Sequence, residues 1–291
     1  RIFVYGRINN NINADMPMHS ITIDRQAFKA FKPIQATDAL LTRSSVDSIE
    51  FKKVENFEFV PNPRLPELFY SFSPNLRTQI GGPDGFFFGE LQLSLDSELL
   101  FKKNLTLTTQ ISASIVDNFD ELKLASDSII PHVRTDIVSY LKGTRGSVYV
   151  ERMQLNYFSK LSENFYGKIT AGLFEPMFGG VGGEILYKPF SKNYGVGIDA
   201  FWVKQRSYEM LDKFLDYETV TGHITTYYRH PASRVLFTLR GGKYLAKDSG
   251  ITFDVSREFK SGLQLGIFFS QTDISSEEFG EGSFDKGFYF H

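Results

Sequence analysis

The chain has 291 residues, which is enough for one large domain and one small one. Hydrophobic residues make up 42% of it, but no run approaches the roughly 18 uninterrupted apolar residues that a membrane-spanning helix needs. The net charge of −2 gives no bulk electrostatic attraction to nucleic acid or to an anionic membrane surface. Aromatic residues reach 15%, which is typical of membrane β-barrels with aromatic girdles and also of aromatic-rich β-sandwiches.

The first sixty residues mix short elements of both kinds. Two strands, two helices and a last strand are predicted, in that order, at Ile2–Ile8, Ser20–Ile23, Asp24–Phe31, Gln35–Leu41 and Ile49–Val60. The linker from Pro61 to Pro66 cannot sustain a helix or a central strand, because prolines interrupt it throughout. We therefore predict a small α+β domain with its linker over residues 1–65, and a second domain over residues 66–291.

Beyond the linker, apolar and polar residues alternate with a period of two, which predicts β-strands with one apolar face. Several of these runs last about 10 to 14 residues, longer than the globular mode of about five or six and long enough to cross hydrocarbon when tilted. About eleven strands are predicted between Leu68 and Phe269, and a twelfth begins at Gly287. An even number of strands is typical of bacterial outer-membrane barrels.

The connections between these strands alternate in length. Tight polar turns are predicted at Phe101–Asn104, Ser159–Asn164, Ser191–Asn193, His230–Ser233 and Glu258–Gly262. The intervening connections are mostly longer, and are predicted at Gly81–Gly85, Asp117–Gly146, Glu175–Gly183, Gln205–Glu218, Ala246–Gly250 and Gln271–Lys286. Short turns at one end and long loops at the other indicate an antiparallel up-and-down transmembrane β-barrel, whereas a β-sandwich has no reason to sort its loops in this way.

In such a barrel the apolar face contacts lipid and the polar face lines the lumen. The polar faces carry both signs of charge, so we expect a lumen crosslinked by ion pairs. The lumen-facing polar candidates are Arg152, Gln154, Asn156, Lys168, Glu184, Asp199, Arg234, Arg240 and Asp254. The alternative for each of them is that it only solvates the lumen.

Signals for catalysis are weak. The five histidines show no spacing typical of a zinc site, so neither a metal nor a cofactor is predicted. His223 shares a face with Thr225 and Tyr227 and could serve an outer-membrane hydrolase, but nothing fixes a serine beside it. Glu175 and Glu184 flank a glycine-rich segment, where loop carboxylates are a simpler interpretation than a glycosidase pair. We expect a protein that is not an enzyme.

Three segments carry a family resemblance. They are Ala171 to Phe190 (AGLFEPMFGGVGGEILYKPF), Val150 to Leu155 (VERMQL) and Gly241 to Asp248 (GGKYLAKD). Together they resemble the YjbH-type exopolysaccharide proteins, relatives of the capsule protein GfcD. The most specific positions form a motif loop that has no catalytic meaning, namely Glu175, Pro176, Gly179, Gly180, Gly182, Gly183 and Glu184.

The resemblance implies an outer-membrane barrel with its N-terminal domain in the periplasm. It also implies a role in exopolysaccharide or capsule export or assembly, and a Wza-like polysaccharide export protein as partner. The lumenal aromatics Phe201, Tyr227 and Phe268 could then stack on sugar rings, or could fill the lumen. A plugged barrel that anchors the periplasmic domain and recruits the exporter is the alternative. Family members are longer, and the chain opens at Arg1 and stops inside a predicted strand, so we expect one portion of a longer protein.

Overall fold

The computed structural model describes residues 2–7, 15–22, 45–48, 65–82, 85–123, 130, 133, 136–189, 192–259, 261–279 and 284–290. The chain divides into two compact units, Arg1–Pro63 and Arg64–His291. The division falls within the proline-rich linker. None of the helices in the described residues is long and apolar enough to cross a bilayer.

The first unit contains a three-stranded antiparallel sheet. Its strands are β1 (Ile2–Arg7), β2 (Asp15–Thr22) and β3 (Ser45–Ser48), in the order β1-β2-β3. The two predicted helices and the strand predicted at residues 49–60 lie outside the described residues. The α+β class of this unit therefore stays a prediction.

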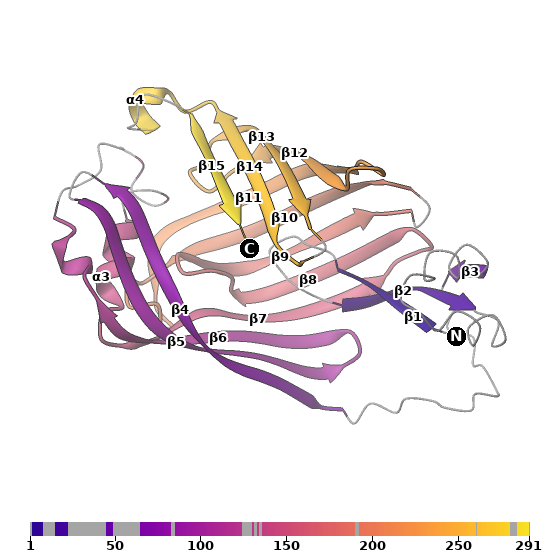
Figure 1. Ribbon diagram of the computed structural model, residues 1–291, viewed down its shortest axis with the longest axis horizontal. Coiled ribbons are helices and arrows are strands. Elements are labelled where there is room, and N and C mark those ends of the chain that lie inside the picture. The colour runs from indigo at the N-terminus through magenta and orange to yellow at the C-terminus, as the bar shows by residue number, and fades with distance from the viewer. Residues whose placement is uncertain are drawn as a thin grey trace. The chain divides into compact units, whose positions relative to one another are not determined.

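The second unit is built on one sheet of twelve antiparallel strands, which confirms the predicted class and strand number. Each strand pairs with its neighbours in sequence, and β4 and β15 are the two end strands. Figure 1 shows the sheet strongly curved. The strands are β4 (Glu67–Gly82), β5 (Gly85–Lys102), β6 (Leu105–Asp117), β7 (Val148–Lys160), β8 (Phe165–Leu173), β9 (Phe178–Tyr187), β10 (Tyr194–Arg206), β11 (Phe214–Arg229), β12 (Val235–Lys243), β13 (Ser249–Glu258), β14 (Gln264–Thr272) and β15 (Asp285–Phe290).

The period-two alternation sorts the side chains onto two unlike faces. We call the face with the buried side chains the inner face and the opposite one the outer face. Large apolar side chains are exposed on the outer face, among them Ile185, Ile198 and Ile224, which lie directly opposite one another on β9, β10 and β11. Polar side chains are buried on the inner face, among them Glu90 and Asn156. This is the reverse of a soluble β-sandwich, whose inner faces are apolar.

The connections are sorted by length less cleanly than predicted. The short-turn end of the sheet has residues 103–104, 161–164, 188–193, 230–234 and 259–263. The opposite end, which we call the loop end, has residues 83–84, 118–147, 174–177, 207–213, 244–248 and 273–284. The predicted loops at 81–85 and 175–183 were wrong, because β4 and β5 almost meet and β9 begins at Phe178. Three short helices belong to the loop end, namely η2 (Phe119–Glu121), α3 (Ile137–Gly143) and α4 (Ser276–Phe279).

Most of the predicted motif loop belongs to a strand, whereas Glu175 and Pro176 lie in the 174–177 connection. Gly179, Gly180, Gly182 and Gly183 all lie in β9 and pair with both β8 and β10. Glycine is needed here because larger neighbours use the space: a Cβ on Gly182 would clash with the Phe201 ring, and one on Gly180 would clash with the Trp202 carbonyl oxygen. The glycine run therefore permits close strand packing and a sharp curve, where the sequence suggested a loop.

Candidate functional site: a packed polar plug inside the sheet

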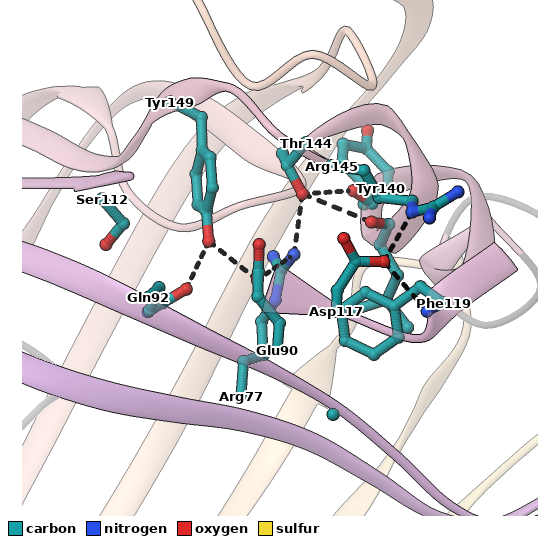
Figure 2. A network of polar contacts seen from close by, with 12 residues as sticks. Arg77, Glu90, Gln92, Ser112, Asp117, Phe119, Tyr140, Thr144, Arg145 and Tyr149 are labelled. Carbon is teal, nitrogen blue, oxygen red and sulfur yellow. Dashed lines mark hydrogen bonds and ion pairs between the residues drawn. The ribbon is translucent and has the colours of Figure 1, made fainter. Parts of the chain in front are cut away.

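The loop end of the inner face is filled by a polar network that joins β4, β5 and β7 to α3. Arg77 Nη2 lies 2.7 Å from Glu90 Oε2 and donates a hydrogen bond of 2.7 Å to Thr144 Oγ1, just after α3. Tyr149 donates from its hydroxyl to Glu90 Oε2 at 3.0 Å and also to Gln92 Oε1. Figure 2 shows Tyr149 and Arg77 converging on Glu90.

The Arg77 guanidinium also has aromatic partners. Its Cζ lies 5.2 Å from the centre of the Tyr149 ring and 5.5 Å from that of Phe119, which belongs to η2. Glu90 and Tyr149 are fully buried. A buried charge is tolerated only when it is paired and hydrogen-bonded, and Glu90 Oε2 meets both conditions through Arg77 and Tyr149. Glu90 Oε1 and Arg77 Nε are buried without a partner among the described residues. The network therefore fixes α3 and η2 against the sheet.

A second set of hydrogen bonds continues from Gln92 across the inner face. Gln92 Nε2 donates to Glu151 Oε1 at 2.7 Å, and Ser112 donates to the same oxygen at 2.6 Å. Ser112 and Ser94 hydroxyls are 2.8 Å apart, and Asn75 donates to Ser94 at 3.0 Å. Strands β4 to β7 thus share one continuous polar layer. Such layers resist opening because each group that is freed leaves a buried partner unsatisfied.

Arg206, at the end of β10, joins three separate segments. Its guanidinium nitrogens donate to the backbone oxygens of Glu175 at 2.6 Å, Val150 at 2.7 Å, Met210 at 2.9 Å, Glu151 at 3.2 Å and Leu211 at 3.3 Å. We call this arrangement the Arg206 clasp. The side chain is fully buried. It therefore pins the 174–177 and 207–213 connections to β7 through backbone carbonyl groups.

Apolar side chains fill the remaining space at this end. One cluster joins Tyr140 of α3 to Tyr149, Met177, Phe178, Val203 and Met210, and a second joins Phe88, Phe119, Leu122 and Leu141. Tyr140 donates to the backbone oxygen of Arg206 at 2.5 Å, and burial raises the pKa of Tyr140 to about 12. The tyrosine is therefore neutral and a donor at physiological pH. The two clusters, the polar network and the Arg206 clasp together form what we call the plug.

Nearer the short-turn end, charged side chains form a row across four strands. Lys168, Glu184, Asp199 and His223 are directly opposite one another on β8 to β11. Lys168 Nζ lies 3.1 Å from Glu184 Oε2, and Asp199 Oδ1 lies 3.0 Å from His223 Nδ1. The His223 ring also packs edge-on to Tyr244, with centroids 4.9 Å apart. The row thus combines two carboxylates with a lysine and a histidine on four neighbouring strands.

The predicted polar residues fall into three groups. Gln154, Asn156, Lys168 and Glu184 are buried on the inner face. Arg152, Asp199, Arg240 and Asp254 are half-buried on their strands. Arg234 was misplaced, because β12 begins at Val235 and Arg234 occupies the exposed turn before it with a φ of 57°.

Partners are recorded for several of these groups. Asn156 accepts from Thr170 at 2.7 Å, and Asp254 accepts from Tyr289 at 3.2 Å. Arg240 Nε lies 3.4 Å from Thr225 Oγ1. The amide of Gln154 makes no hydrogen bond to a described residue, although its atoms are fully buried. The lumen-facing role of the set stays a prediction.

The three aromatic candidates are half-buried on the inner face. Phe201 packs edge-on to Phe174 at 5.7 Å between centroids and belongs to the edge of the plug. Tyr227 lies beside Gly197, and the Phe268 ring lies over Gly287. Phe201 is thus already covered by packing, and the stacking of Tyr227 and Phe268 on sugar rings stays a prediction.

Sequence reasoning missed Arg77, Glu90, Tyr149 and Arg206. The inward position of Glu90 could have been predicted, because Glu90 continues the alternation of Gln92 and Ser94 along β5. Tyr149 and Arg206 could not be assigned by alternation, because the register shifts between Gln110 and Ile111, opposite β7, and between Lys204 and Arg206 on β10. Such irregularities reverse which residues point inward beyond them.

The arrangements that the sequence suggested for catalysis can be placed on the inner face. Asp199 orients His223 as in a catalytic triad, but His223 Nε2 is buried and has no hydrogen-bond partner among the described residues. No three His, Asp, Glu or Cys side chains gather into a metal site within the same described part of the chain. The Glu175 and Glu184 pair considered for glycoside hydrolysis is divided between a connection and a strand, and Glu184 already pairs with Lys168.

The fold and the plug define an all-β protein with a twelve-stranded antiparallel sheet, an apolar outer face and a polar, partly filled inner face. The family model for YjbH, described as exopolysaccharide biosynthesis protein YbjH, matches residues 8–291. The chain belongs to this YjbH exopolysaccharide biosynthesis family, which confirms the resemblance found in its sequence.

Two individual proteins can be compared with the chain. It is 33% identical over 293 residues to the uncharacterized lipoprotein YjbH of Escherichia coli strain K12, covering 97% of this chain and 41% of that protein. The chain thus spans well under half the length of this relative. Among solved structures, Salmonella typhi OmpF in complex with daunomycin matches with a TM-score of 0.39 and 11% identity, over 72% of this chain and 80% of that one.

Proposed function

We propose that the twelve-stranded sheet is the wall of an outer-membrane β-barrel that takes part, without catalysis, in exopolysaccharide export or assembly. One observation carries the membrane placement: every strand of the sheet exposes a large apolar side chain on the outer face. Examples in strand order are Leu76, Leu93, Ile115, Leu155, Ile169, Ile185, Ile198, Ile224, Leu239, Ile251, Ile267 and Phe288.

The exposure is too extensive for a sheet in water. Ile185, Ile198 and Ile224 keep 50%, 57% and 56% of their surface exposed although they are cross-strand neighbours. Soluble monomers rarely expose apolar patches beyond a few hundred Å². Hydrocarbon accepts such a surface where strand pairing satisfies the backbone, as it does on both sides of β5 to β14. A closed barrel also requires pairing along the free edges of the end strands β4 and β15.

The connections support an orientation. Outer-membrane barrels place short turns in the periplasm and long loops outside the cell. The plug then lies at the extracellular end, because α3 and the 207–213 connection belong to the loop end. Strand β4 begins at the short-turn end, so the first unit would belong to the periplasm. There it could meet a Wza-like polysaccharide export protein, the partner that we propose.

The single tryptophan allows a direct test of the membrane placement. Trp202 lies on the outer face of β10 with 44% of its surface exposed, and its neighbour Phe201 points inward. In bilayers of brominated lipid we expect strong quenching of Trp202 fluorescence in the full-length protein, with any tryptophan outside these 291 residues replaced by phenylalanine. The matched control is Trp202→Phe combined with Phe201→Trp, which moves the indole to the inner face and should escape quenching. Equal quenching of both proteins, or of neither, would contradict the placement.

The plug favours a second candidate function, a closed barrel that anchors the periplasmic unit and recruits the exporter. The observation behind it is the fully buried set of Arg206, Tyr140 and Tyr149 at one end of the inner face. Single-channel recording on the full-length protein separates the two candidates. Stable conductance that the cell's own exopolysaccharide blocks would support a conduit. A folded barrel that stays silent with and without polymer would rule out the conduit and leave the anchor.

A further inference from the structure

The outer face has a shallow apolar groove of about 280 Å³ across β10 to β13. Its floor includes Val196, Thr226 and Leu239, and its sides include four aromatic residues, Tyr194, Tyr228, Phe237 and Phe253. The volume is close to the lower end of the roughly 300–1,000 Å³ typical of small-molecule sites.

The aromatic side chains form one connected series along the groove. Tyr228 stacks on Phe237 with centroids 6.4 Å apart, and Phe237 lies 6.5 Å from Phe253. Phe253 lies 5.5 Å from Phe269, and Tyr194, which is directly opposite Tyr228 on the neighbouring strand, lies 6.5 Å from Tyr187. Tyr187, Tyr194 and Tyr228 are close to the short turns, where amphipathic rings are expected at a membrane interface.

Two arginines lie on the short-turn side of the groove. Arg257 is directly opposite Val235, two residues before Phe237 on the same face of β12. Arg234 is exposed in the turn that precedes β12. The Arg257 guanidinium stacks 5.0 Å from the Phe259 ring, and no ion pair is recorded for either arginine with another described residue. Two cationic side chains that form no ion pair with the described residues therefore border an apolar groove.

An apolar groove bordered by two arginines is suited to an amphiphile with an anionic head. A sugar chain in this groove would place many hydroxyl groups against carbon, with few partners for their hydrogen bonds. An acyl chain needs no such partners, and guanidinium groups bind phosphate in a bidentate manner. The groove opens on the face that would contact lipid, so the ligand is present in the surrounding bilayer.

We propose that this groove holds an acyl chain of an anionic glycerophospholipid from the leaflet at the short-turn end, with Arg257 and Arg234 binding the headgroup phosphate. The proposal rests on the proposed membrane placement of the outer face. It adds a specific lipid site to a surface that would otherwise be covered by lipid of any kind.

The test is lipid retention by the full-length protein. The protein is reconstituted into nanodiscs of phosphatidylcholine with one tenth phosphatidylglycerol, and the lipids that stay bound after transfer to mild detergent are counted by native mass spectrometry. We expect phosphatidylglycerol to be enriched by about fivefold for each arginine that meets its headgroup, because its negative charge is uncompensated, whereas choline neutralises the phosphate of phosphatidylcholine. The R234Q/R257Q variant should bring the ratio close to that of the bilayer. The K142Q/K213Q variant removes two exposed cations from the loop end and should keep the enrichment.

A second variant tests the groove itself. Thr226→Trp fills the exposed floor from outside without touching the inner face, and should lower the retention of both lipids. A protein that inserts into nanodiscs but shows no phosphatidylglycerol enrichment would overturn the lipid site and leave the membrane placement standing. A protein that does not insert would overturn both. If R234Q/R257Q keeps its lipid but loses a periplasmic protein partner, the arginines form a protein-docking surface and the lipid proposal fails.

Discussion

Replacing Arg206 by methionine should release the plug without unfolding the sheet. Methionine fills a similar length but donates no hydrogen bond, so five backbone carbonyl groups lose their contact with the guanidinium. Each hydrogen bond to a charged group is worth about 1.5–3 kcal/mol, and part of this is offset because a buried guanidinium no longer has to be desolvated. The Met210 oxygen also keeps a hydrogen bond from the Val150 amide. We therefore expect a net loss of about 3–5 kcal/mol, close to that for breaking one buried ion pair.

The loss should be local, because the clasp holds connections and not the strand ladder. We expect amide hydrogen exchange in residues 207–213 and 174–177 to accelerate by about 10²–10⁴-fold, since each 1.4 kcal/mol corresponds to tenfold. Exchange in β7 to β11 should change little. Arg145→Met is the control, because Arg145 is partly exposed and its ion pairs with Asp117 and Asp120 at 2.5 and 3.1 Å are of the surface kind, worth about 0–1 kcal/mol. If exchange in these connections is unchanged in the Arg206→Met variant, the clasp is not what holds them to the sheet.

Three further substitutions test the inner face, each followed by urea unfolding of the reconstituted protein. Tyr149→Phe removes the hydroxyl that donates to Glu90 and Gln92 and should lower the free energy of unfolding by about 1–3 kcal/mol. An unchanged free energy would mean that this hydroxyl does not stabilise the plug. Glu184→Gln leaves Lys168 buried beside a neutral amide and should cost about 3–5 kcal/mol, whereas exchanging both for apolar residues should recover most of it. Gly182→Ala forces the Phe201 ring to move, at about 1–3 kcal/mol, and the added change Phe201→Ala should reduce the penalty, so strictly additive effects would exclude the clash.

The parts of the fold that follow from local alternation were predictable from sequence. The twelve strands, the apolar outer face and the burial of Gln154, Asn156 and Lys168 all depend on a period of two, which survives as long as the register is regular. The plug was not predictable, because Tyr149 and Arg206 follow irregular pairings and meet only after strands distant in sequence curve together. The glycine segment around Gly182 was misread for a related reason. Gly182 leaves room for the Phe201 ring on the next strand, and the segment does not form a turn.

The Arg206 clasp has a practical consequence for engineering this protein. Surface loops normally tolerate inserted epitopes or tags, because their length is unconstrained by packing. Here the 174–177 and 207–213 connections are tied through one side chain to the backbone of β7, so an insertion in either would pull on the other. The loop-end segment around α4 has exposed side chains, and Glu278 accepts hydrogen bonds from Ser275 of the same turn. A label for surface mapping belongs there, because a label in the clasped connections would disturb the packing that it is meant to report on.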